Sequence, residues 1–167
     1  MRRAMTIGRF GLRRKDYDFP PFRPPSEANS LLLRVTRGCP WNRCSFCSMY
    51  KTSQFEIRDL EEIERDITLA KELYQGRVRT VFMGDSNSLV VRTDTLVSVL
   101  NSLYTAFPEV ERVTSYARAK TLAKKPIEEL GRLRKAGSRV WRARACSSEG
   151  FSWLRRCVPC VPAGIAG

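Results

Sequence analysis

Strand-like and helix-like segments alternate along the middle of this chain, and that alternation limits the folds it can adopt. Short apolar runs predict four strands, at residues 30–36, 80–83 and 112–116 and beginning at 138–141. Between these runs, apolar residues recur every three or four positions, which predicts helices at residues 59–75, 93–107 and 127–136. Alternating strands and helices are typical of a parallel sheet, so we expect an α/β fold.

Residues at the helix ends support these boundaries. Thr93 or Asp94 is expected to cap the second helix, because short polar side chains accept hydrogen bonds from the first turn. Pro126 suits the first turn of the third helix, and Gly137 suits its C-terminal cap.

Polar segments follow three of the predicted strands. A cysteine-containing loop follows the first strand, GDSNS (residues 84–88) follows the second, and SYARAK (residues 115–120) follows the third. Ligands of parallel α/β folds bind at the carboxyl ends of the strands. The sequence therefore predicts a functional site at this edge of the sheet.

The length and composition suit a globular protein inside the cell. The chain has 167 residues, of which 43% are apolar, and no apolar run long enough to cross a membrane. Its N-terminus has arginines but no apolar segment typical of a secretory signal, so we expect a cytoplasmic protein. Reducing conditions there argue against reading the six cysteines as a disulfide framework.

The net charge of +13 comes mainly from the two ends of the chain. Residues 1–28 carry seven basic and three acidic side chains, and residues 131–167 carry eight and one. Basic ends can contact phosphates, but solvated ends are the favoured interpretation. A nucleic-acid partner is therefore allowed by the charge but not favoured.

Three cysteines lie within nine residues directly after the first predicted strand. Cys39, Cys44 and Cys47 have the spacing C-x4-C-x2-C in the stretch RGCPWNRCSFC. Three thiolates in one loop can hold three irons of a 4Fe-4S cluster and leave the fourth iron open to a small molecule. The stretch therefore predicts a reactive metal centre.

This stretch resembles the cluster loop of the radical S-adenosylmethionine enzymes. Their usual spacing is C-x3-C-x-aromatic-C at the end of the first strand; Phe46 takes the aromatic position here, and the first gap has four residues instead of three. The resemblance covers about residues 30–140. It implies the family's partial TIM-type (βα)6 barrel, truncated in this chain after about three and a half βα units.

The resemblance implies radical chemistry with two cofactors. The three cysteines would bind a 4Fe-4S cluster, whose electron cleaves S-adenosylmethionine to a 5′-deoxyadenosyl radical that abstracts hydrogen from an unknown substrate. A flavodoxin-like or ferredoxin-like protein would supply the electron.

The resemblance also implies contacts for S-adenosylmethionine. The residues expected to make them are Phe46, Gly84, Asp85, Ser86, Ser115 and Arg118. Phe46 would lie near the adenine, and residues 84–86 take the place of a glycine-rich motif that contacts the amino group. The last two would lie near the ribose and carboxylate. A loop cap is an equal alternative for Asp85, and a solvated strand end is the favoured interpretation for Ser115 and Arg118.

The end of the chain differs in composition from the rest. Residues 138–167 contain no Lys, Asp, Asn, Gln, Thr or Tyr and show no apolar periodicity. We interpret them as a frameshifted reading frame from about residue 139 or as a disordered basic tail. The expected organisation is a flexible, Pro-rich lead-in at residues 1–28, the core at 29–140 and this tail at 141–167. An inactive fragment is one of the expected outcomes.

A small zinc-binding nucleic-acid module is the alternative function. The basic ends and the cysteines favour it. Because the chain has no histidine, the fourth zinc ligand would be Cys146, Cys157 or Cys160.

Overall fold

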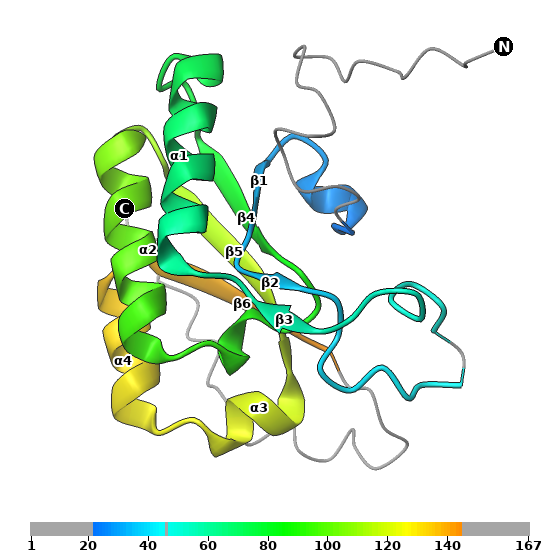
Figure 1. Ribbon diagram of the computed structural model, residues 1–167. Coiled ribbons are helices and arrows are strands. Elements are labelled where there is room, and N and C mark those ends of the chain that lie inside the picture. The colour runs from blue at the N-terminus through cyan, green and yellow to red at the C-terminus, as the bar shows by residue number, and fades with distance from the viewer. Residues whose placement is uncertain (1–21, 46, 145–167) are drawn as a thin grey trace, which may run out of the picture.

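A parallel sheet lies at the centre of the computed structural model, which describes residues 22–45 and 47–144 (Figure 1). Its strands follow the order β1–β4–β5–β6, and every neighbouring pair is parallel. They are Leu31–Arg34 (β1), Thr80–Gly84 (β4), Arg112–Arg118 (β5) and Ser138–Arg144 (β6). The predicted α/β class with a parallel sheet is confirmed.

The expected barrel geometry is not confirmed. Within the described residues, β1 and β6 form the two edges of an open sheet, and no closed barrel is present. A barrel closes only when enough tilted strands bring the first and last edges together. The partial (βα)6 barrel therefore stays a proposal.

Three helices cover one face of the sheet (Figure 1). They are α1 (Leu60–Tyr74), α2 (Thr93–Ala106) and α4 (Ile127–Lys135), and α2 contacts both of the others. Each helix turns an apolar stripe to the core, where Ile63, Leu100 and Leu133 are fully buried. None of the described helices has the length and apolar character needed to span a membrane.

Strand residues alternate between the two faces of the sheet. Leu33, Met83 and Val113 belong to the large core under the helices. Their neighbours Phe82 and Tyr116 belong to a second apolar cluster, and the two rings meet edge to face with centroids 5.0 Å apart. Side chains of a strand alternate with a period of two, so both faces of these central strands are apolar.

The start of α2 differs from the prediction. Arg92 precedes the first turn, and no side-chain cap is present there. The Thr93 hydroxyl donates a hydrogen bond to Glu129, and Arg132 donates one of 2.6 Å to Asp94. The predicted cap is wrong because both polar side chains bind partners on α4 instead.

The end of α4 agrees better with the sequence. Gly137 follows the helix with φ +104°, a conformation that favours glycine. The Tyr104 hydroxyl of α2 donates a hydrogen bond of 2.8 Å to the Gly137 carbonyl. Pro126 lies at the N-cap, one residue before the first turn.

A short antiparallel ladder closes the cysteine loop. The chain leaves β1, forms β2 (Thr36–Arg37), passes through the loop and returns as β3 (Glu56–Ile57). The sequence predicts a single strand at residues 30–36, whereas β1 ends at Arg34 and β2 pairs with a different partner.

Two short helices flank the carboxyl ends of the strands. A single 3-10 turn, η2 (Ser88–Val90), follows β4, and α3 (Ala119–Lys124) follows β5. They contact each other. The predicted polar loop at residues 115–120 is therefore the end of β5 and the start of α3.

Part of the expected lead-in packs against the amino ends of the strands. The 3-10 helix η1 (Pro25–Glu27) buries Glu27 completely. Its carboxylate accepts hydrogen bonds from Ser30 (2.7 Å) and from Arg112 of β5 (3.3 Å). Residues 1–21 and 145–167 lie outside the described residues, so the domain boundaries and the frameshifted tail stay predictions.

Candidate functional site

The three predicted polar segments meet at the carboxyl edge of the sheet. The Val35 amide donates a hydrogen bond of 2.8 Å to the Gly84 carbonyl, which joins the ends of β1 and β4. The Ser86 hydroxyl donates one of 2.9 Å to the Gly38 carbonyl at the start of the cysteine loop. These contacts bring the cysteine loop and the GDSNS segment together.

Asn87 joins the GDSNS segment to the end of β5. Its side-chain oxygen accepts a hydrogen bond of 3.0 Å from the Arg118 amide, and its side-chain nitrogen donates one of 2.9 Å to Thr121 on α3. Asn87 is almost fully buried. Asn87 is not among the site residues predicted from the sequence, although its place in a polar segment after a buried strand was a usable signal.

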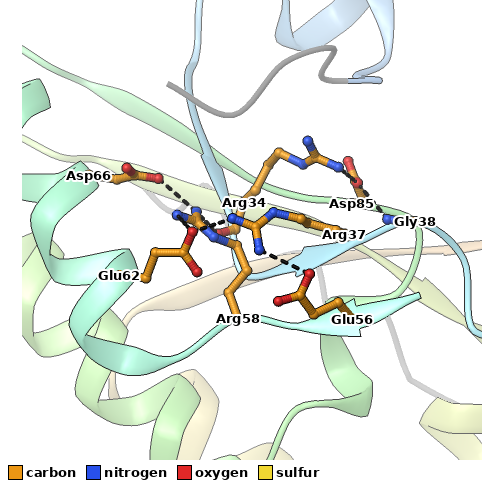
Figure 2. Close-up of polar contacts among 8 residues, drawn as sticks. All are labelled: Arg34, Arg37, Gly38, Glu56, Arg58, Glu62, Asp66 and Asp85. Carbon is orange, nitrogen blue, oxygen red and sulfur yellow. Dashed lines mark hydrogen bonds and ion pairs between the residues drawn. The ribbon is translucent and has the colours of Figure 1, made fainter. Parts of the chain in front are cut away.

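Asp85 is buried in contacts with its own chain (Figure 2). Its carboxylate pairs with Arg34 and accepts a hydrogen bond of 3.1 Å from the Gly38 amide. Its own amide donates to the Thr36 hydroxyl at 3.2 Å. The carboxylate therefore fixes the entry to the cysteine loop, and it has zero solvent exposure.

Arg34 is a residue that the sequence analysis missed. It lies in β1, within an otherwise apolar run, and is only 6% exposed. A buried arginine needs a paired acid, and Asp85 supplies it from the position directly after the neighbouring strand β4. A charged residue inside an apolar strand was the available signal.

A second buried arginine ties β3 to the rest of the site. Arg58 directly follows β3 and donates hydrogen bonds of 2.7 Å to the Arg34 carbonyl and to the Asp66 carboxylate of α1. It also lies 3.2 Å from Glu62. Burial lowers the pKa of Arg58, but its bonds to the two carboxylates outweigh that effect and raise it overall.

Arg37 extends this network to the ladder (Figure 2). It pairs with Glu62 of α1 and with Glu56 of β3, the latter at 3.1 Å. Burial raises the pKa of Glu62, but Arg58 and Arg37 outweigh it and hold that pKa below its usual range. The two ends of the cysteine loop are thus connected to one helix by ion pairs.

The cysteine loop itself is held by its backbone. Gly38 has φ +72°, and a Cβ there would lie 2.8 Å from the Gln54 carbonyl oxygen, where the chain returns. Asn42 has φ +44° and donates a hydrogen bond of 2.7 Å to the Tyr50 carbonyl. Lys51 donates one of 2.9 Å back to the Asn42 carbonyl.

Cys39, Cys44 and Cys47 are free thiols, and each is partly exposed. Burial raises the pKa of Cys39, but hydrogen bonds from the Asn42 backbone and the Ser86 hydroxyl, with the charge of Arg118, outweigh it and lower the pKa overall. A lowered pKa favours the thiolate, which is the form that binds metals.

The donor chemistry of this loop fits an iron–sulfur group, although the side chains do not form a metal site as they stand. Within residues 22–45 and 47–144, no group of three His, Cys, Asp or Glu side chains can hold a metal ion. Three unoxidised thiols in one partly exposed loop are nevertheless the ligand set such a group requires. Binding therefore requires the loop to draw the thiols together.

The remaining predicted residues are placed differently. Ser115 is fully buried, and its hydroxyl donates to the carbonyls of Met83 (2.8 Å) and Tyr116 (3.2 Å), so it lies inside the sheet rather than at a solvated end. The Arg118 guanidinium lies 5.0 Å from the centre of the Trp41 ring. Phe46 lies outside the described residues, as do Cys146, Cys157 and Cys160.

Comparison of the chain with protein-family models and with curated proteins found no match in either case.

Proposed function

We propose that this chain is the N-terminal part of a radical S-adenosylmethionine core in a cytoplasmic enzyme. One observation carries the proposal: three free thiols follow the first strand of a parallel sheet, and the loop that holds them contacts Ser86, just after β4, and Arg118, at the end of β5. Functional sites of parallel α/β folds lie at this edge.

The chain's own residues would bind and orient the cofactors. Cys39, Cys44 and Cys47 would hold a 4Fe-4S cluster, which would supply the electron for cleaving S-adenosylmethionine to methionine and a 5′-deoxyadenosyl radical. Asp85 would hold the loop in position through Gly38 and Arg34. Since its carboxylate is already bonded, backbone groups of the GDSNS segment are better placed to accept a hydrogen bond from the ligand's amino group.

The electron donor would be a flavodoxin-like or ferredoxin-like protein. Arg118, at the end of β5, stays the candidate contact for the S-adenosylmethionine carboxylate. Phe46 stays the candidate contact for its adenine.

Anaerobic reconstitution with ferrous iron and sulfide tests the proposal. The protein should turn brown with absorbance near about 400 nm, and Cys39→Ala, Cys44→Ala and Cys47→Ala should each lose most of it. Ser45→Ala and Ser48→Ala are matched controls, because both serines are exposed in the same loop and should leave the absorbance unchanged.

The zinc alternative gives the opposite result. A colourless protein that binds zinc stoichiometrically, and keeps it in the presence of iron and sulfide, would contradict the proposal and favour the zinc module. With the reconstituted protein, S-adenosylmethionine and a reductant, 5′-deoxyadenosine should form, and Cys44→Ala should abolish it.

A further inference from the structure

The arginines around the cysteine loop fall into two groups. Arg34, Arg37 and Arg58 each pair with a carboxylate. The ion pairs within residues 22–45 and 47–144 include neither Arg43 nor Arg118. Two positive charges at this edge are therefore not neutralised by a described acid.

Both unneutralised arginines lie against the same aromatic ring. The guanidinium carbon of Arg118 is 5.0 Å from the centre of the Trp41 ring, and that of Arg43 is 5.9 Å from it. Trp41 is 42% exposed, an unusual value for a tryptophan. Trp41 and Arg43 come from the cysteine loop, whereas Arg118 ends β5, so the fold brings the three together.

This combination matches the chemistry of a nucleotide. Guanidinium groups bind phosphate through paired hydrogen bonds, and an exposed indole offers a face on which a planar base can stack. S-adenosylmethionine has one carboxylate and no phosphate, so it would leave one of the two guanidinium groups without an anion. A ligand with a base and a phosphate would use all three side chains.

We infer that Arg43, Trp41 and Arg118 bind a nucleotide unit, with its base on the indole and its phosphate on the guanidinium groups. The same chemistry is present in a free nucleotide and in single-stranded RNA. Binding does not depend on the proposed function, because none of the three residues needs the metal.

Binding of a labelled oligonucleotide to the full chain, without added iron, tests the inference. The probe is a fluorescein-labelled single-stranded oligoadenylate of about eight nucleotides, titrated between about 50 and 200 mM salt. Trp41→Ala should weaken binding by about 5- to 150-fold without changing the salt dependence. Arg43→Ala and Arg118→Ala should each lower the slope of log affinity against log salt by about 0.7.

Arg65→Ala is the matched control, because Arg65 is an exposed arginine of α1 and its loss changes the net charge equally. It should leave affinity and slope near those of the parent chain. If Trp41→Ala and Arg118→Ala also bind like the parent, the basic ends account for binding and the inference is wrong. Circular dichroism of each variant checks that it is folded.

Competition separates the possible ligands. AMP should displace the probe better than adenosine or S-adenosylmethionine, since only AMP has a phosphate. Equal displacement by all three would overturn the inference, because it would show that the phosphate contributes nothing to binding. Displacement by AMP and the unlabelled oligomer at similar nucleotide concentrations supports a free nucleotide, whereas a strong preference for the oligomer supports RNA. Loss of probe binding is measured without metal, so it is distinguishable from a failed reconstitution.

Discussion

At the scale of single residues, Gly38 shows how one backbone conformation shapes the site. Its φ is +72°, and a Cβ added there would lie only 2.8 Å from the Gln54 carbonyl oxygen of the returning chain. We expect Gly38→Ala to lower the free energy of unfolding by about 1–3 kcal/mol, measured by urea denaturation. Gly131→Ala is the control: it lies within α4 with no atom near a new Cβ, and should raise stability by about 0.5–1 kcal/mol. Equal effects of the two changes would contradict this account.

The Cys39 thiol allows a prediction about pH. Its pKa is lowered in the folded chain, so the thiolate, the reactive form, should persist to lower pH than in the unfolded chain. Iodoacetamide labelling of Cys39, followed by mass spectrometry across pH, should therefore reach half its maximal rate at a lower pH in the native protein than in urea. Ser86→Ala should move the native midpoint upward, because it removes one hydrogen bond to the thiolate. A native midpoint at or above that of the unfolded chain would contradict the prediction.

The sequence indicates some of these residues but not their partners. The three cysteines and the segment at residues 84–88 could be singled out because unusual residue types follow apolar strands. The pairing of Asp85 with Arg34 could not be predicted from the sequence, because the two residues are 51 positions apart and only the parallel register of β1 and β4 brings them together. For the same reason, the contact of Arg118 with Trp41 depends on the fold.

At the scale of elements, Arg58 connects β3, β1 and α1. It is 3% exposed and binds Asp66, Glu62 and the Arg34 carbonyl. Arg58→Met should lower the free energy of unfolding by about 3–5 kcal/mol, because the nearly buried Asp66 is left without its cation. Urea denaturation measures this loss. Arg77→Met is the control, since Arg77 is exposed and, among the described residues, its side chain bonds only to Gln75. This change should alter stability by less than about 0.5 kcal/mol.

The elements that the sequence predicts well are the long ones. α1 and α2 bury apolar residues at helical spacing, and their bounds differ from the prediction by about one residue. β2 and β3 have two residues each, too few for an alternating pattern to indicate them. α3 was missed because its six residues include no fully buried apolar side chain.

At the scale of the whole molecule, the order of strands and helices predicts the sheet but not its closure. Parallel neighbours need crossover connections, and three amphipathic helices provide them. Barrel closure depends on the number, tilt and stagger of strands, which apolar periodicity does not encode. The described sheet also carries apolar clusters on both faces, so its two sides should unfold together.

That coupling gives a prediction for the molecule as a unit. Leu100 of α2 is fully buried in the large core between the helices and the sheet, and Phe82 of β4 is fully buried in the second cluster on the opposite face. Leu100→Ala should lower the free energy of unfolding by about 2–5 kcal/mol and Phe82→Ala by about 3–5 kcal/mol. In each variant, circular dichroism and tryptophan fluorescence should report a single unfolding transition with the same midpoint. Thr105→Ala, at an exposed position of α2, should shift it little. Two separate transitions, each sensitive to only one core substitution, would show that the two faces fold independently.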